Sequence, residues 1–554
     1  MQTSRLTLTL LVACCAPAAA MAQAIGPVGE DARVAPRGAV GIMIGGSWSR
    51  WAETFGRLTP AGADGKVVPL GARFSFDSLG SKQLQSLAGV QQSIRSLAAL
   101  PGFAASLGTF AFSQRNQIVE TPVGLKLGLW GHVELSATAP LIEAHAESRL
   151  GVNPTGSEGN VSFNPARGLA SALAGNANLL SQFDSAAAQV NRRLVQCAAT
   201  PAAAGCSNVN ANAATARALV QDANTFANAM AALYGGRTGG RGALFVPVSG
   251  TPAQTAIEAR IAAYRTQFAT FGSAALTGTG PYAAAPFSVA DAATLLSDSA
   301  YGFRARPLAT AVTRGMGDVE LGLKLKLFDT FGDGDYASSG FHVRQSVGVT
   351  YRMGTGKLDS PDDFTDLGTG QHQNDIELRA IADVGIGRRF FVTLFSRYNM
   401  QGADSRVMRV SGPGDSPLVP SYREHSVQRN LGDELELALS PRLKLNGYVT
   451  LWGGYAYRSK SADAYRGSFQ ATNLDGAAVT IDASVLNAGT EETEQRLSAG
   501  ATFSTVDAWT RGTARLPLEV SFAHYQSVAG TGGLAPKLVV DQVRFTVYRR
   551  LFGR

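Results

Sequence analysis

The sequence has little charge, few cysteines and histidines, and no long apolar segment beyond its N-terminus. Charged residues make up 16% of the 554 positions, whereas soluble domains typically carry about 25%. This deficit fits a protein that has lipid on one side. Because no later run of about 18 apolar residues occurs, we expect no helix to span a bilayer. Lys and Arg are dispersed and the net charge is only +7, so nucleic-acid binding has no support.

Motifs for catalysis and for cofactor binding are also missing. There is no Gly-x-Ser-x-Gly elbow, no His-Glu-x-x-His helix and no phosphate-binding loop, and the six histidines are scattered. We therefore expect no enzymatic activity and no cofactor. Two acidic segments lie in loops, one with Asp359, Asp362, Asp363 and Asp366, the other with Asp329, Asp333 and Asp335. Calcium is the alternative there, but the spacing matches no full ligand set and favours solvated loops without a metal.

The N-terminus has the pattern of a bacterial secretory signal. Arg5 is followed by an apolar stretch at 6–15 and small residues at 16–24, which predicts a signal peptide over 1–22, with cleavage after Ala22 or Ala24. Residues 11–14 also resemble a lipobox, and that alternative leaves a lipidated Cys14 at the mature N-terminus. Export means an oxidising compartment, so Cys197 and Cys206 are expected to form a disulfide. Two free thiols are the alternative.

The strongest structural signal is a two-residue alternation of apolar and polar side chains. In the segment 317–328, GDVELGLKLKLF, the apolar residues at odd positions alternate with Glu320, Gly322, Lys324 and Lys326. Successive side chains of a strand point to opposite faces. The alternation recurs at 123–129 and 133–138, which are joined by Trp130, Gly131 and His132 and predict a tight hairpin. Strands of this kind behind a secretory signal are typical of outer-membrane barrels, with apolar residues toward lipid and charges toward the lumen.

The chain therefore predicts an all-β transmembrane barrel of about 12 antiparallel strands, with an α-helical insertion. Fourteen strands is the alternative, if residues 66–76 and 109–117 join the sheet. After the hairpin, strands are expected at 315–328, 340–354, 370–386, 388–404, 424–440, 442–460, 493–507, 514–529 and 537–551. A first strand is expected at 39–55, with a turn at 63–65 after it, and tight turns are expected at 385–388 and 440–442. The gaps 355–369, 405–423 and 461–492 are long and polar, and short and long connections alternate as in barrels with periplasmic turns and extracellular loops.

Two segments have helical spacing instead. Residues 81–100 place Leu84, Leu87, Val90, Ile94 and Leu97 on one face. The segment 150–314 carries three apolar stripes, which lie along Leu169, Leu173, Leu180, Phe183, Val190 and Leu194; Leu219, Phe226, Met230 and Leu233; Ile257, Ile261, Tyr264, Phe268 and Phe271. Capping boxes are expected at 251–254 and 288–291. The organisation is thus a signal peptide (1–22), first barrel strands with a helical extracellular loop at 81–100 (23–149), a helical insertion (150–314) and the remaining strands (315–554).

Charged residues on the strands define candidate lumen-lining positions. These are Glu320, Lys324, Lys326, Arg344, Arg352, Glu377, Arg379, Asp383, Glu434, Glu436, Lys444, Glu519 and Arg544. They either neutralise one another or contact a solute, and polar lumens serve both roles. Aromatic residues near predicted strand ends are expected to form interfacial girdles: Trp130, Phe328, Phe390, Phe391, Trp452, Tyr455, Tyr457 and Tyr548.

Three stretches carry a family resemblance. These are 123–145, 315–328 and 353–400, the last with GTGK at 354–357, LGTGQ at 367–371 and GRRFFVTLFSRYN at 387–399. They resemble the outer-membrane transporter family linked to meta-pathway phenol degradation, which is broadly similar to long-chain fatty-acid channels. The resemblance implies a channel for hydrophobic or aromatic small molecules. The helical insertion of some 160 residues departs from that family, as does a C-terminus in which Phe552 is followed by Gly553 and Arg554.

The expected location is the bacterial outer membrane, with outer-membrane lipid, lipopolysaccharide and hydrophobic small molecules as partners. If the hairpin at 130–132 is periplasmic, residue 150 emerges outside the cell. The segment 150–314 is then expected to form a helical cap over, or partly within, the extracellular mouth. A structural or surface-display barrel whose cap binds a partner is the alternative function.

Overall fold

The computed structural model describes residues 29–56, 65–155, 159–237, 239–331, 340–411, 416–532 and 535–552. The expected signal peptide, the lipidated Cys14, most of the turn at 63–65, Asp333, Asp335 and the last two residues lie outside this part of the chain. Two compact units are present. One comprises residues up to 73 together with 112–149 and 304–554, and the other comprises 74–111 and 150–303.

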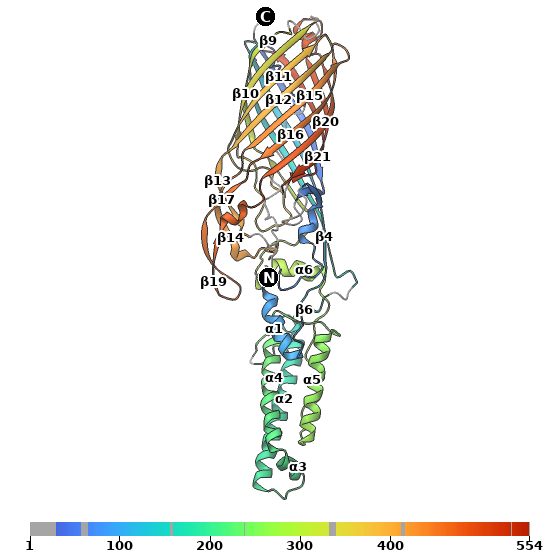
Figure 1. Cartoon of the computed structure of the whole chain (residues 1–554), viewed down its shortest axis with the longest axis vertical. Helices are drawn as coiled ribbons and strands as arrows, with labels where there is room; N and C mark the ends of the chain where they lie inside the picture. The colour runs from blue at the N-terminus through green and yellow to red at the C-terminus, as the bar shows by residue number, and fades with distance from the viewer. Residues whose placement is uncertain are drawn as a thin grey trace, which may run out of the picture. The chain divides into compact units, whose positions relative to one another are not determined.

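The first unit is a closed antiparallel barrel of twelve strands (Figure 1). Each strand pairs with the next around the wall, and β4 pairs with β5 to close it. The short strand β8 (Ala311–Met316) pairs with β5 beyond the part that pairs with β9, so β8 and β9 together occupy one position in the wall. The strands, in the order around the barrel, are β4 (Phe110–Leu129), β1 (Ala39–Trp51), β23 (Val539–Arg550), β21 (Leu518–Thr531), β20 (Glu492–Ser504), β16 (Val449–Lys460), β15 (Glu434–Lys444), β12 (Phe390–Gln401), β11 (Asp375–Ile386), β10 (Phe341–Met353), β9 (Val319–Asp329) and β5 (Val133–Val152). The prediction of twelve strands is confirmed.

The alternative of fourteen strands is wrong for two reasons. Residues 110–117 are the first part of the 20-residue strand β4, so they add no strand. Lys66–Pro69 is β3, which pairs with β2 (Glu53–Gly56) in a separate three-stranded sheet completed by β22 (Ala535–Pro536). Closure leaves no free edge at the wall for another strand to join.

Two further strand boundaries differ from the prediction. Residues 424–440 divide into β14 (Glu424–Asn430), which pairs with β13 (Ala403–Arg409) and β17 (Ala464–Arg466), and the barrel strand β15. The expected turn at 440–442 lies inside β15, where Pro441 is opposite Val392, and the true turn is at 445–448. β18 (Ser468–Thr472) and β19 (Ala478–Asp482) form a hairpin in the connection predicted to be a loop.

The short and long connections are sorted to opposite ends of the barrel. The end called here the hairpin end holds the turns at 130–132, 387–389 and 445–448, the end of β9, the start of β10 and the connection 505–517. It also holds the first and last barrel residues, since Ala39 is opposite Arg550. The other end, called here the loop end, holds the long connections. Trp130 and Gly131 have positive φ, as the favoured two-residue hairpin turn requires. The hairpin prediction is confirmed.

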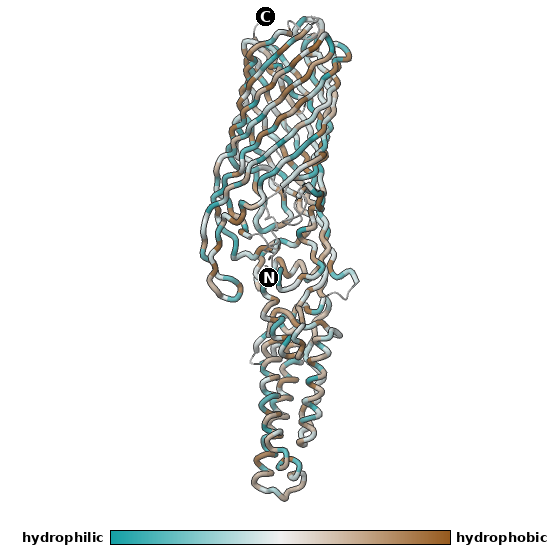
Figure 2. The backbone as a smooth tube through the Cα atoms, in the orientation of Figure 1, coloured by the Kyte–Doolittle hydropathy of each residue, from teal (hydrophilic) through white to brown (hydrophobic). Residues whose placement is uncertain are grey.

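Apolar side chains cover the outer face of the wall. Leu378, Leu394, Leu437, Leu439 and Phe522 are among those that are 45–52% exposed, and hydrophobic and hydrophilic residues alternate along the strands (Figure 2). A sheet with an apolar outside and a charged inside is the construction of an outer-membrane barrel. Among the described helices none combines the length and the hydropathy needed to cross a membrane.

The aromatic prediction is wrong in part. Trp130, Phe328, Phe390 and Tyr455 are 42–71% exposed, whereas Phe391, Trp452 and Tyr548 are at most 9% exposed. Consecutive residues of a strand face opposite sides, so Phe390 and Phe391 cannot both point to lipid. Phe391, Trp452 and Tyr548 point inward instead.

The second unit is a helical bundle with its own core. Its helices are α1 (Ser86–Ala98), α2 (Ala170–Ala199), α3 (Cys206–Ala211), α4 (Ala213–Tyr234), α5 (Pro252–Thr270) and α6 (Val289–Ser297), with a small sheet of β6 (Val161–Phe163) and β7 (Phe245–Pro247). The apolar stripes of α4 and α5 are fully buried, and on α2 Leu180, Phe183 and Val190 are buried. Leu169 is 58% exposed, because it precedes the first turn of α2.

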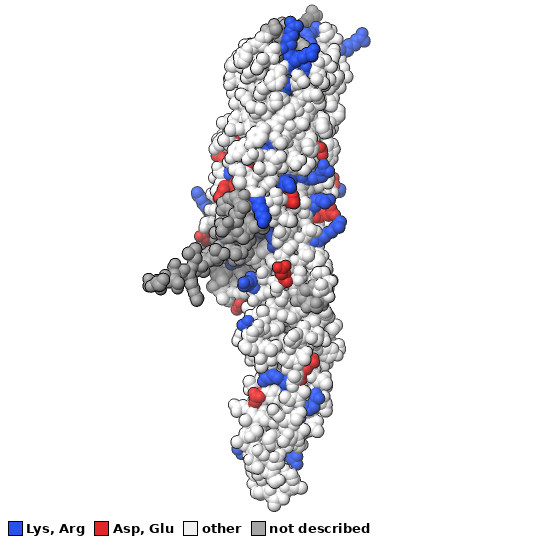
Figure 3. Space-filling model, turned by 45° about the vertical axis from the view of Figure 1, so that its right-hand side comes forward, with Lys and Arg blue, Asp and Glu red and all other residues white. Residues whose placement is uncertain are grey.

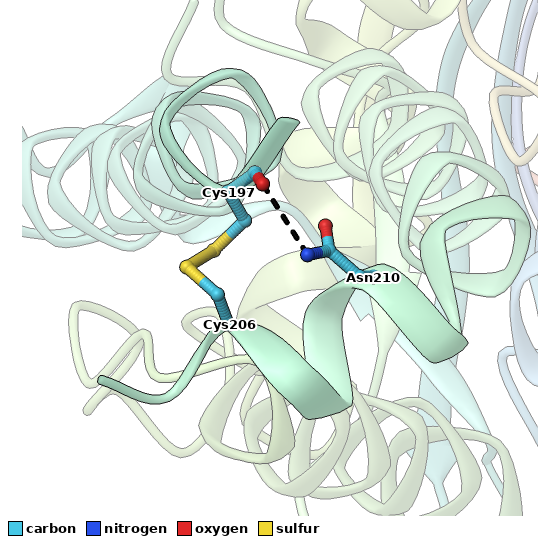
Figure 4. Close-up of a disulfide and its surroundings, with 3 residues drawn as sticks. All are labelled: Cys197, Cys206 and Asn210. Atoms are coloured by element: carbon cyan, nitrogen blue, oxygen red, sulfur yellow. Dashed lines mark hydrogen bonds between the residues drawn. A yellow bond between two sulfur atoms is a disulfide. The ribbon is translucent and has the colours of Figure 1, made fainter. Parts of the chain in front are cut away.

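Local signals in this unit are confirmed with one exception. Ser288 and Asp291 form the predicted capping box. The box predicted at Thr251 is absent, because Gln254 instead accepts the Tyr234 hydroxyl and donates to Glu258. Cys197 and Cys206 form the predicted disulfide, beside which Asn210 donates to the carbonyl of Cys197 (Figure 4).

Candidate functional site in the barrel interior

A belt of alternating charges lies on the inner face of seven neighbouring strands, from β9 to β20. Its arginines each contact carboxylates of their own strand or of strands nearby. Arg352 lies 2.8 Å from Glu320, 3.3 Å from Asp375 and 3.6 Å from Glu377. Arg397 continues the belt to Glu377 (3.4 Å) and Glu436 (2.6 Å). All of these side chains except Glu320 are nearly or fully buried.

The belt continues across β15, β16 and β20. Arg458 lies 2.5 Å from Glu434 and 3.8 Å from Glu492, and Arg496 lies 3.4 Å from Glu436. A buried charge is tolerated only when it is paired and hydrogen-bonded. The belt meets this need by giving each guanidinium at least two carboxylates.

Most of the thirteen predicted candidates make ion pairs inside the barrel. Those that form an ion pair are Glu320, Lys324, Lys326, Arg344, Arg352, Glu377, Arg379, Asp383, Glu434, Glu436 and Glu519. The Lys444 ammonium lies 5.7 Å from the centre of the Phe391 ring, and Arg544 lines the cavity described below. Asp329, which was assigned to a loop, binds Lys326 and Arg344.

The segment before β1 runs back into the barrel and was not foreseen from the sequence. The backbone N–H of Ala32 donates to Asp383 of β11 (3.0 Å), and that of Ala35 donates to Glu134 of β5 (2.7 Å). Arg442 of β15 donates to the carbonyls of Gly29 and Glu30. Because these partners sit on separate strands and face inward, residues 29–35 occupy the lumen near the hairpin end.

Ion pairs hold this N-terminal segment in place. Lys324 donates to the Glu30 carboxylate (3.0 Å) and to the Asp31 carbonyl (2.7 Å), and Arg379 lies 3.4 Å from Glu30. Burial by itself raises the pKa of Glu30, but Lys324 and Arg379 outweigh it and lower the pKa to about 2. Glu30 is therefore ionised throughout the physiological pH range.

Two cavities flank the segment. The larger, of about 560 Å³, lies at the hairpin end and is lined by charged groups that include Lys126, Lys326, Glu519 and Arg544. The smaller, of about 70 Å³, lies beyond Gly29 beside Trp452, Tyr525 and Arg496. Both cavities are bordered by residues of the segment, Gly29 and Glu30 among them.

One side of the interior at the loop end is apolar instead of charged. Inward-facing Trp51, Ile118, Ile142, Tyr525 and Val540 form one buried cluster. Leu367 and Leu538, from two long connections, complete the cluster. The apolar cluster, on β1, β4, β5, β21 and β23, therefore lies across the interior from the charged belt on β9 to β20, with Arg496 5.9 Å from the Tyr525 ring.

The acidic loop at 359–366 is not solvated as expected. Asp359 pairs with Arg406 (2.9 Å), Asp362 with Arg409 (2.6 Å) and Asp363 with Arg306 (3.6 Å). Their partners come from distant segments, which the spacing of the acids alone cannot reveal. No group of three metal-binding side chains occurs within the described ranges.

The glycine-rich motifs of the family resemblance meet at one buried aspartate. Asp318 is 1% exposed and accepts the backbone N–H groups of Gly356 (2.7 Å) and Gln371 (3.0 Å). A Cβ at Gly356 or Gly370 would lie 2.8 and 2.7 Å from Asp318 oxygens. The motifs thus fix the connection between β10 and β11, and their role here is structural.

Sequence reasoning missed several charged residues of the interior. Arg397, Arg442, Arg458 and Arg496 lie on inward positions of their strands. The spacing along the strand could have identified them, because residues an even number of positions apart point to the same face. Arg397 is six residues from the inward-facing Phe391, and Arg458 is six residues from the inward-facing Trp452.

Comparisons with known proteins find structural likeness only. No family model matches the sequence, and no curated protein matches it. An outer membrane channel of Pseudomonas putida F1 is 10% identical, with a TM-score of 0.37, covering 95% of this chain and all of that one. The toluene transporter TodX of Pseudomonas putida is 10% identical (TM-score 0.21; 94% and 90% covered), and the translocator domain of the autotransporter NalP from Neisseria meningitidis is 8% identical (TM-score 0.26; 93% and 90% covered). These values are too low to transfer a function. The assignment depends instead on the structure of this chain, whose closed wall is apolar outside and charged inside. The protein is a bacterial outer-membrane β-barrel.

Proposed function

We propose that the barrel is a passive channel for hydrophobic or aromatic small molecules, with the route through its interior. The observation that carries this proposal is the apolar cluster at the loop end, whose members Trp51, Ile118, Ile142, Tyr525 and Val540 face inward. Apolar residues on the outer wall are explained by lipid, but these are not. An inward apolar zone is where a hydrophobic solute can leave water. The solute class also follows from the sequence resemblance.

The proposal also gives a role to the thirteen candidate residues and to the N-terminal segment. The candidate residues line the route and the segment lies across it, so that passage requires the segment to move. Since Glu30, Asp31 and Ala32 are held by Lys324, Arg442 and Asp383, weakening these contacts opens the route further. The short turns of such barrels lie on the periplasmic side, so entry is from the loop end.

A transport assay tests the channel. Full-length protein in liposomes is expected to speed toluene equilibration and to show small, fluctuating ion conductance. The substitution Lys324→Gln is expected to raise the conductance, because Glu30 and the Asp31 carbonyl lose a partner. A matched control is Lys66→Gln, since Lys66 is exposed and lies on β3 outside the barrel wall. Absence of conductance and of uptake in both the wild type and Lys324→Gln would reject the channel.

Surface labelling tests the orientation. Val195 of α2 is 72% exposed, so Val195→Cys, in a chain with both native cysteines changed to serine, presents a thiol to solvent. Labelling in intact cells is expected if the loop end is extracellular. Labelling only after lysis would invert the topology.

A structural barrel that displays a binding surface is the second candidate. The observation that favours it is the size of the helical unit, which has its own buried core and a disulfide. A transporting barrel does not need such a unit. This function remains if no transport is measured and cells lose adhesion to a partner when residues 170–270 are removed.

A further inference from the structure

Seven arginines are exposed at the hairpin end of the barrel. One precedes β1, two form the β11–β12 turn, two lie between β20 and β21, and two end β23; they are Arg37, Arg388, Arg389, Arg511, Arg515, Arg549 and Arg550. Figure 3 shows basic side chains gathered at this end, next to a band of mostly uncharged surface. This set is called the arginine rim below.

The arginine rim has no acidic partner within the described part of the chain. Acidic groups of this end are engaged inside the barrel instead: Asp329 with Lys326 and Arg344, and Glu519 with Arg33. Arg550 lies 5.1 Å from the Trp509 ring, a contact that leaves its charge uncompensated. The rim is therefore a cluster of like charges that repel one another unless an anion binds.

Exposed aromatic residues lie directly beside the rim. Trp130 is 71% exposed, Phe341 69%, Phe390 42%, Tyr448 44% and Phe503 41%, and all of them are at or next to the hairpin-end termini of their strands. Aromatic belts of membrane proteins sit at the level of the lipid headgroups. The arginines, one to a few residues farther out, are thus at the level of the phosphates.

We propose that the arginine rim binds the phosphate groups of anionic glycerophospholipids in the leaflet at the hairpin end. Guanidinium groups form bidentate, charge-assisted hydrogen bonds with phosphate oxygens. A basic side chain beside an anionic leaflet contributes about 1 kcal/mol, so seven together select anionic over zwitterionic lipid. The rim fixes the depth and tilt of the barrel, and it does so whether or not the barrel transports a solute.

Lipid selectivity measures this directly. Full-length protein is placed in nanodiscs of phosphatidylcholine with a minor fraction of spin-labelled phosphatidylglycerol, and the fraction of immobilised label is compared with that of spin-labelled phosphatidylcholine. The wild type is expected to prefer phosphatidylglycerol. Arg388→Gln with Arg389→Gln is expected to reduce that preference about 30-fold, the equivalent of two contributions of about 1 kcal/mol. The same pair changed to lysine is expected to keep most of it.

Two controls make the result specific. Arg192→Gln with Arg217→Gln removes the same charge from exposed positions of α2 and α4, and is expected to leave selectivity unchanged. Heat-modifiable migration on gels verifies that each variant is folded. Equal immobilisation of both lipids by the wild type, or equal loss in both glutamine pairs, would overturn the proposal. A higher preference for lipid A than for phosphatidylglycerol that is lost in Arg388→Gln with Arg389→Gln would overturn the choice of lipid and leaflet.

Discussion

The barrel and the helical unit place the same kinds of residue on opposite sides. In β15, Leu435, Leu437 and Leu439 are 37–47% exposed, while Glu434 and Glu436 are 5% exposed. In α4, Phe226 and Met230 are at most 3% exposed. Lipid surrounds the barrel wall and water surrounds the helices, so the apolar face turns outward in one and inward in the other. The medium around each region, lipid or water, therefore determines whether its apolar side chains are exposed or buried.

The largest effect is expected from emptying the core of the helical unit. Phe226 packs against Phe183 and Tyr264, with ring centres 5.9 and 5.1 Å away. Phe226→Ala is expected to cost about 3–5 kcal/mol in the free energy of unfolding of this unit. Helical circular dichroism during urea titration measures the loss, and the heat-modifiable gel shift of the barrel should stay as in the wild type. A simultaneous loss of that shift would mean that the two units fold as one.

Introducing an arginine on the outer surface of each region tests the difference between their surroundings. Leu437 of β15 is 47% exposed and Val195 of α2 is 72% exposed. Leu437→Arg is expected to cost about 2–4 kcal/mol because the side chain faces lipid. Val195→Arg is expected to change stability by less than about 0.5 kcal/mol because the side chain faces water. Equal costs, measured by refolding into liposomes, would remove the distinction between the two regions.

The disulfide should act on the helices alone. It closes a loop between two cysteines nine residues apart. Replacing both with serine is expected to cost about 2–3 kcal/mol in the helical unit, with no change in the barrel. Protease cleavage near residues 200–205 should become faster, while conductance should not. A change in conductance would couple this loop to the lumen.

The smallest effect is expected from lowering the pH, and it is expected in the conductance of the barrel only. Glu30 has a lowered pKa, about 2 instead of 4.5, so its ion pairs are complete above pH 4.5 and are lost as the pH falls toward 2. Conductance should rise across this interval as the N-terminal segment loosens. In Glu30→Gln the pairing is already absent, and that rise should be smaller. An equal rise in both proteins would assign the effect to the belt carboxylates instead.

Local patterns of the chain predicted much of this molecule. The two-residue alternation at 317–328, repeated along the chain, predicted the twelve strands and their inward charges, because side-chain direction in a strand depends only on parity. The spacing of Val90 and Ile94, and of Ile257 and Ile261, predicted helices for the same kind of reason. The two cysteines outside the signal predicted their own pairing.

What the sequence by itself determined about this protein is the type of each element and the face it presents, since both follow from neighbours a few residues apart. Only the tertiary structure decided which distant groups meet. The N–H of Ala32 bonds to Asp383, 351 residues away, and the acids of the loop at 359–366 find Arg306, Arg406 and Arg409. Such contacts depend on the register of twelve closed strands, and no local pattern carries that register. For this reason the N-terminal segment inside the lumen had no counterpart among the predictions made from the sequence.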